Sequence, residues 1–135
     1  MLPVDGDTIR LFLHVTAAAV WVGGQITVAG LLGTVRGLGD EAPGAVARAF
    51  ARVAWPAYVV LVMTGIWNLL AVDVGDQSSA YMVTLGVKLV VVVLAGVAAA
   101  AHSFSRSRAV LAIGGAVGAT ASLAAVFFGV MLAGS

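Results

Sequence analysis

Long apolar runs separated by short polar pieces are the dominant pattern of this 135-residue chain. The runs cover about residues 9–34, 47–72, 80–102 and 109–133. Each holds the roughly 20 apolar residues that a helix needs to cross about 30 Å of hydrocarbon. Because the connections are short, consecutive helices are expected to run antiparallel. The pattern predicts an all-α, polytopic membrane protein, an antiparallel four-transmembrane-helix bundle in a single membrane domain over residues 1–135.

Composition and charge exclude several other classes of protein. The chain is 61% hydrophobic and 10% charged, which is too apolar for a water-soluble domain of this size. It has no cysteine, so disulfides and thiolate metal ligands are excluded. A net charge of +1 gives no indication of nucleic-acid binding. The first apolar run lacks a basic segment before it and is too long for a signal peptide, so we expect it to remain as a helix.

The distribution of Lys and Arg predicts the orientation, because positively charged connections stay in the cytoplasm. Five arginines flank the first and third connections: Arg36, Arg48, Arg52, Arg106 and Arg108. The other side has one arginine and four acids: Arg10, Asp5, Asp7, Asp73 and Asp76. Both termini are therefore expected to be extracytoplasmic, in a multi-pass protein of the bacterial inner membrane with the lipid bilayer as its main partner.

Two ionisable residues interrupt the apolar runs, His14 in the first and Lys88 in the third. A lysine at the centre of a span costs roughly 2.5–3.5 kcal/mol, and intramembrane ionisable residues are functional candidates by default. At about 1.5 Å rise per residue, His14 lies about 9 Å and Lys88 about 12 Å below the outer surface. The two residues are level and are expected to define a site. The alternative for Lys88 is a stem that lifts its ammonium to the interface.

Helical spacing places other side chains at the same depth or on the same face. His14, Trp21 and Gln25 share a face of the first helix. Thr64 and Asn68 share a face of the second. The expected cofactor-binding pocket lies in the outer leaflet and is built around five residues: His14, Lys88, Trp21, Thr64 and Asn68. For Trp21 the alternative role is packing or the interfacial belt.

Three segments, in this order, resemble the copper resistance D (CopD) domain family. The first is Leu-His-Val at residues 13–15 with Trp-Val-Gly-Gly at 21–24. The second is the Arg/Phe-containing turn at 48–52 leading to Thr-Gly at 64–65, and the third is Gly-Val-Lys-Leu at 86–89. The resemblance implies an integral membrane protein of copper homeostasis, which binds or transports a copper ion through an outer-leaflet intramembrane site.

Four residues in the outer half are candidate metal ligands. His14 offers an imidazole, and Met63, Met82 and Met131 offer thioethers. Imidazole and thioether ligands suit Cu(I). The alternative is that these methionines fill gaps in the packing, as methionines usually do.

The His of the first helix and the Lys of the third also resemble the HemJ-type protoporphyrinogen oxidases, a related four-helix membrane family associated with haem b. Residues 25–28, Gln-Ile-Thr-Val, depart from that family's pattern. The resemblance implies the alternative function, a haem b-binding membrane redox or haem-handling protein with His14 as axial ligand. Lys88 or Arg10 would then meet a propionate, and small residues such as Ala17 and Ala18 would make room for the macrocycle.

No residues are predicted to be catalytic, because the chain has no nucleophile with a base and an orienting group, and no paired carboxylates within a span. An enzymatic activity, if present, would be that of a haem-dependent membrane oxidoreductase. His102 lies about 33 Å from the outer end of its helix. It is therefore expected at the cytoplasmic rim, apart from the pocket.

The fourth apolar run carries a ridge of small residues, Gly114, Gly118 and Ser122. Such a ridge lets another helix approach closely. The helix that packs against this ridge belongs either to the same chain or to a second copy in a homo-oligomer.

Overall fold

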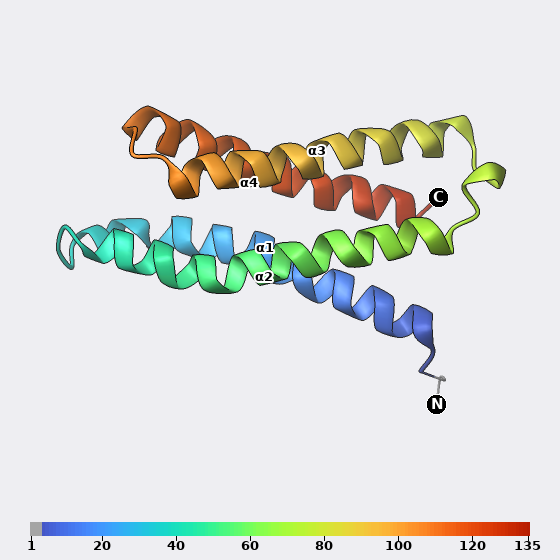
Figure 1. Cartoon of the computed structure of the whole chain (residues 1–135), viewed down its shortest axis with the longest axis horizontal. Helices are drawn as coiled ribbons and strands as arrows, with labels where there is room; N and C mark the ends of the chain where they lie inside the picture. Colours follow the sequence, from blue (N-terminus) through green and yellow to red (C-terminus); the bar gives the residue numbers. More distant parts are fainter. Residues whose placement is uncertain (1–3) are drawn as a thin grey trace. The chain divides into compact units, whose positions relative to one another are not determined.

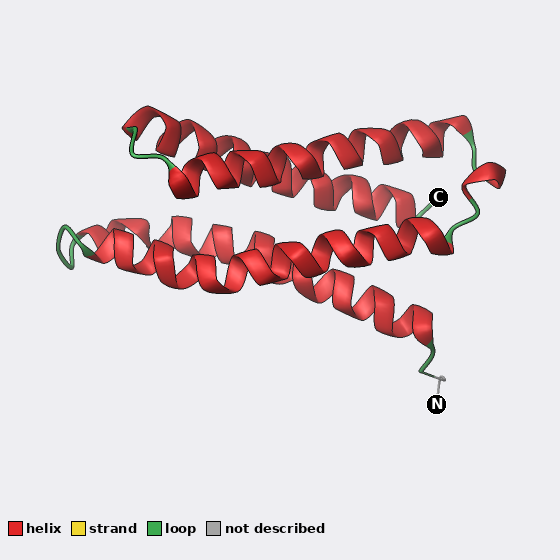
Figure 2. Cartoon of the chain, viewed as in Figure 1, coloured by secondary structure: helices red, strands yellow, loops and turns green. Residues whose placement is uncertain are grey.

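The computed structural model describes residues 4–135 and contains four long helices (Figures 1 and 2). They are α1 (Gly6–Arg36), α2 (Ala42–Ala71), α3 (Ser79–Phe104) and α4 (Arg108–Ala133), with a 3-10 turn, η1 (Val74–Asp76), before α3. No strand occurs in this described range. The predicted all-α class with four membrane-length helices is confirmed.

The helices extend beyond the predicted apolar runs because polar residues set their ends. Asp5 caps α1 by accepting a hydrogen bond from the Thr8 backbone N–H at 2.8 Å. Ser78 caps α3 in the same way, accepting from the Tyr81 N–H at 3.1 Å. Helix α2 has a proline in its first turn, where a missing N–H costs nothing, and so begins at Ala42 rather than at the predicted residue 47.

All four helices are long and apolar enough to cross a membrane, so the chain is a multi-pass membrane protein. Leucine, valine, isoleucine and phenylalanine side chains are exposed along each helix, and no large side chain among residues 4–135 is completely buried. In water such a surface would drive aggregation. Lipid tails are the solvent that this surface fits.

The chain divides after Val72 into two compact units, the α1·α2 pair and the α3·α4 pair. Each pair consists of antiparallel helices joined by a short loop, residues 37–41 in the first and 105–107 in the second (Figure 1). Gly39, in the first loop, has a φ of 121°, which favours glycine. Each pair is described by itself below.

Aromatic rings fill the seam of the α1·α2 pair. Trp21 is 4% exposed, and its ring centroid lies 5.9 Å from that of Trp55 and 4.6 Å from that of Tyr58. Further along the seam, the Phe50 ring lies on the backbone of Gly24, so closely that a Cβ added there would overlap it. Aromatic rings therefore make much of the contact between the two helices.

Glycine and alanine fill the seam of the α3·α4 pair instead. A Cβ added at Gly114 would lie 3.0 Å from the Ala98 carbonyl oxygen and 3.1 Å from the His102 backbone nitrogen. Gly118 and Ser122, the other members of the predicted ridge, are also buried in this pair. The ridge thus packs against a helix of the same chain, which is the first of the two predicted alternatives. Helix α3 of the same chain covers it, and a second copy has no access to it in this packing.

Candidate functional site

A side-chain hydrogen bond joins the two helices of the first pair. His14 Nδ1 on α1 lies 2.8 Å from Thr64 Oγ1 on α2. Thr64 is 5% exposed and His14 is half-buried, so both side chains lie in the seam. Two residues that the sequence placed at one depth are thus in direct contact. This link is the centre of the candidate site.

Thr64 also determines which nitrogen of neutral His14 carries the hydrogen. Its hydroxyl lies 2.7 Å from the Val60 carbonyl oxygen and 3.2 Å from that of Leu61. Carbonyls only accept, so the single hydroxyl hydrogen is donated to them. Oγ1 must then accept from His14, which assigns the hydrogen to Nδ1 and the lone pair to Nε2. Metal-ligating histidines typically donate their other ring N–H to a carboxylate, a backbone carbonyl or water, and here a threonine hydroxyl takes that place.

Small residues surround the imidazole. A Cβ added at Gly65 would lie 3.7 Å from His14 Cε1, an ordinary contact distance, so the ring lies beside the Gly65 backbone. Ala17, one turn further along α1, is 5% exposed. Neither residue brings a long side chain to the imidazole.

Arg10 also belongs to this cluster, whereas the sequence analysis gave it as a flanking charge and as one of two candidate partners of a haem propionate. It precedes His14 by one helical turn on the same face of α1, and its side chain is 10% exposed. Nη2 lies 3.3 Å from Asp7 Oδ1, whereas Nε and Nη1 are buried without a hydrogen-bond partner among the described residues. An unsatisfied buried donor costs about 1–3 kcal/mol. The i, i+4 spacing to His14 is the sequence signal that places Arg10 beside the imidazole.

Asn68 and Trp21 extend the cluster along the seam. Because α1 and α2 are antiparallel, a step of four residues toward the N-terminus of α1 matches a step of four residues toward the C-terminus of α2. Because His14 contacts Thr64, Arg10 therefore falls at the level of Asn68, which is half-buried. Trp21 lies on the other side of His14, within the aromatic packing of the pair. The polar residues of the pair thus gather where α1 begins and α2 ends.

Lys88, the predicted intramembrane charge, lies in the α3·α4 pair and is half-buried. A Cβ added at Gly129 on α4 would lie 3.3 Å from Lys88 Nζ and 3.7 Å from Cε. The end of the lysine stem therefore packs against the α4 backbone, in space that Gly129 leaves open. Lys88 has no hydrogen bond or ion pair with any residue of the described range.

The structure shows no methionine ligand at His14 within the first pair. Met63 precedes Thr64 on α2 but is 65% exposed, because consecutive helical residues point in different directions. In the second pair, Met82 and Met131 are also exposed. Residues 4–135 contain no group of three or more His, Cys, Asp or Glu side chains able to hold a metal ion.

His102 has a structural role in the α3·α4 pair. Its Nδ1 donates to the Leu111 carbonyl oxygen at 2.5 Å. A Cβ added at Gly115 would lie 3.0 Å from that same nitrogen, so the imidazole occupies room that Gly115 provides. The bond joins the last turn of α3 to the first turn of α4, in the end of the pair where the sequence placed His102.

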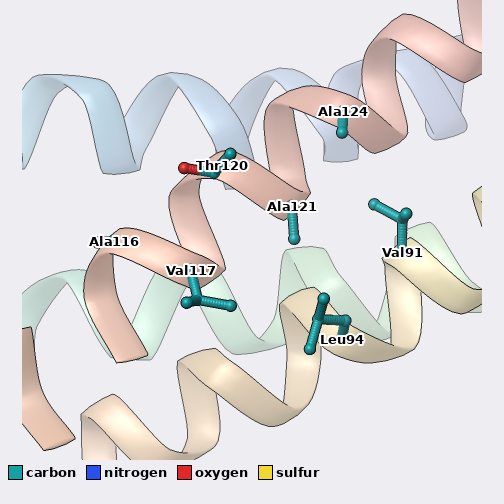
Figure 3. Close-up of a pocket in the computed structure, with 7 residues that line it drawn as sticks. All are labelled: Val91, Leu94, Ala116, Val117, Thr120, Ala121 and Ala124. Atoms are coloured by element: carbon teal, nitrogen blue, oxygen red, sulfur yellow. The ribbon is translucent and has the colours of Figure 1, made fainter. Parts of the chain in front are cut away.

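The α3·α4 pair also carries a shallow groove of about 410 Å³ (Figure 3). Val91 and Leu94 of α3 line it with a row of α4 residues, and Thr120 supplies its one polar side chain. None of the predicted site residues lines this groove. Its apolar walls suit a lipid tail or another helix rather than polar chemistry.

Comparison with known proteins finds no matching family model, curated protein or solved structure. The fold therefore defines the class by itself: an all-α, multi-pass membrane protein with a polar cluster inside its first helix pair.

Proposed function

We propose that the chain is a haem b-binding protein of the bacterial cell membrane, of the redox or haem-handling type, with His14 as an axial ligand. The observation that carries the proposal is the hydrogen bond between His14 Nδ1 and Thr64, which fixes the orientation of the imidazole between α1 and α2. An imidazole held in this way is a common axial ligand of haem iron. Both termini would be extracytoplasmic, as the arginine distribution predicts.

The residues of the cluster fit such a group. His14 supplies one nitrogen ligand, and Gly65 and Ala17 bring little side-chain volume to it. Trp21 would line one side of the site, and Asn68 would supply a polar contact. A bound haem b would provide one-electron chemistry at its iron, while the helices set its environment.

Copper binding is the second candidate. The CopD-like segments at residues 13–15, 21–24 and 86–89 favour it, and an imidazole nitrogen suits a copper ion as well as haem iron. The expected thioether ligands are Met63, Met82 and Met131. Met63 is 65% exposed, so its side chain would have to turn toward the imidazole on binding.

The absorption spectrum of the purified full-length protein, oxidised and then reduced with dithionite, tests the proposal. We expect a stoichiometric Soret band that His14→Ala abolishes. His102→Ala is the matched control, because His102 also donates from Nδ1 to an oxygen acceptor but lies at the other end of its helix pair. A Soret band retained in His14→Ala and lost in His102→Ala would contradict the proposal.

A colourless protein, even from cells with adequate haem supply, would also contradict the haem proposal and direct attention to copper. Copper titration would then be expected to depend on His14. Substitution of Met63 and Met131 together by leucine should weaken copper binding, with Met82→Leu tested separately. Unchanged copper affinity in the double variant would rule out the thioether ligands.

A further inference from the structure

Arg10 is a buried cation whose hydrogen-bonding capacity is only partly used. Its side chain is 10% exposed, and Nη2 lies 3.3 Å from Asp7 Oδ1. Nε and Nη1 are buried without a hydrogen-bond partner among the described residues. Buried polar groups in proteins are nearly always satisfied, so two unsatisfied donors on one guanidinium indicate that an anionic ligand completes the site.

The length of α1 places this guanidinium at the headgroup layer of the bilayer. The 31 residues of α1 span about 46 Å at about 1.5 Å per residue, whereas the hydrocarbon is about 30 Å thick. If the excess is shared between the two ends, about five residues at each end lie outside the hydrocarbon. Arg10 is the fifth residue of α1, and its contact with Asp7 shows that the side chain is directed toward the helix start. The guanidinium therefore lies where lipid headgroups begin.

The second helix of the pair gives the same depth. By the register of the His14 to Thr64 contact, Asn68 falls at the level of Arg10. Asn68 is three residues from the end of α2, which corresponds to about 5 Å. Its half-buried side chain carries amide donors. Both helices thus bring a hydrogen-bond donor to the headgroup layer.

A lipid phosphate is the anion that this layer supplies. The guanidinium has two forked edges, Nε with Nη2 and Nη1 with Nη2, and each edge can hold a phosphate by two parallel hydrogen bonds. Asp7 touches only Nη2 and is 72% exposed, so a phosphate can replace it from the headgroup side as the guanidinium turns outward. Leu11 and Val15 are exposed on one face of α1 and continue from Arg10 into the hydrocarbon, where acyl chains lie.

We propose that Arg10 binds the phosphate of a phospholipid in the leaflet at this end of α1, with Asn68 beside it. The inference assigns Asp7 the role of an internal anion, which pairs with Arg10 when no lipid is bound. It goes beyond the proposed function and does not depend on which group His14 holds.

Native mass spectrometry of the full-length protein in detergent tests the inference. Phosphatidylglycerol is titrated against diacylglycerol, which has the same acyl chains and no phosphate. The wild type is expected to bind phosphatidylglycerol about tenfold more tightly, since hydrogen bonds to a charged group are strong. Arg10→Gln should remove this preference and leave the affinity for diacylglycerol unchanged. Arg36→Gln, which removes an exposed charge from the other end of α1, should have a smaller effect.

Removal of the internal anion provides a second test. Asp7→Asn should increase the affinity for phosphatidylglycerol, because the phosphate no longer has to displace a carboxylate from Nη2. Asp40→Asn is the matched control, since it makes the same change of charge in the loop at the other end of α1. Equal gains in the two variants would contradict the competition between Asp7 and the phosphate.

Three outcomes of the lipid titration would overturn the proposal. Equal affinity of the wild type for the two lipids would show that the phosphate contributes nothing. Equal weakening of both lipids in Arg10→Gln would assign Arg10 a structural role. A loss of phosphatidylglycerol in Arg36→Gln as large as in Arg10→Gln would indicate general attraction of positive charge for anionic lipid.

Free phosphate is the other source of the same chemistry. The titration is therefore repeated with inorganic phosphate in millimolar excess over the lipid. Binding of phosphatidylglycerol that is unchanged by inorganic phosphate supports a lipid site. Displacement of the lipid in the wild type, with no displacement in Arg10→Gln, would overturn it in favour of a site for free phosphate.

Discussion

The two helix pairs have similar lengths and the same antiparallel arrangement but are held together in different ways. Rings of Trp21, Trp55 and Tyr58 separate α1 from α2, whereas Gly114 and Gly118 bring α4 onto the backbone of α3. The polar side chains differ as well. His14 and Thr64 bond to each other across the first seam, whereas Lys88 and His102 of the second pair pack where Gly129 and Gly115 leave room on α4. The comparison indicates that the first pair is held by aromatic packing and a side-chain link, and the second by backbone packing at glycine.

Alanine at a packed glycine should distinguish the two seams most strongly. In Gly114→Ala the new Cβ meets backbone atoms of α3, which cannot turn aside, so we expect a loss of about 1–3 kcal/mol in the free energy of unfolding. In Gly24→Ala the new Cβ meets the end of the Phe50 ring, which can rotate, so the loss should be smaller. Unfolding in mixed micelles with increasing dodecyl sulfate measures both.

Glycines with no neighbour within 4 Å provide the matched controls, Gly86 for the second pair and Gly23 for the first. Alanine at either position should leave the stability unchanged or raise it, because alanine favours a helix over glycine. A loss in Gly24→Ala as large as in Gly114→Ala would contradict the distinction between ring packing and backbone packing.

Removal of the Thr64 hydroxyl tests the polar link of the first pair and should have an intermediate effect. Thr64→Val keeps the shape but removes the acceptor for His14 Nδ1, so we expect a loss of about 1 kcal/mol in the free energy of unfolding. The same substitution at Thr120, exposed on α4, is the control and should cost less. Equal losses at the two positions would show that the His14 to Thr64 bond adds nothing specific to the first pair.

The smallest expected effect is at the beginning of α1. Hydrogen bonds from the Thr8 backbone N–H and hydroxyl hold the pKa of Asp5 below its usual value of 3.8. A carboxyl with a lowered pKa stabilises the fold above its unfolded pKa, and this contribution disappears as the pH falls through the lowered value. At neutral pH, the Thr8 amide should be better protected from hydrogen exchange in the wild type than in Asp5→Ala. This difference in protection should become smaller in acid. A difference independent of pH would contradict a role for the charge.

Hydropathy predicted the four helices, and helical rise predicted the level of Thr64 with His14. These features depend on repeating patterns within one helix, which a sequence displays directly. The buried state of Arg10, the Gly129 backbone against Lys88 and the Phe50 ring on Gly24 depend on how two helices dock. No periodicity within one helix reports such contacts, so they were not predicted.

The methionine ligands show the same distinction. Met63 was grouped with His14 because the rise per residue places both at a similar depth below the outer membrane surface. The direction of a side chain around the helix axis decides whether it reaches a partner, and Met63 points away from the seam that Thr64 enters. Whether a methionine turns inward on copper binding remains a prediction for the titration above.

The hydrogen bond between His14 and Thr64 also bears on how the nascent chain enters the bilayer. Thr64 already bonds within its own helix, but His14 Nδ1 would lack Thr64 if α1 partitioned alone, whereas a hairpin of α1 and α2 pairs the two side chains before hydrocarbon surrounds them. The first two helices are thus best inserted together, as one unit of membrane integration. Biogenesis of this chain would then wait for the end of α2 to leave the ribosome before α1 is committed to the lipid.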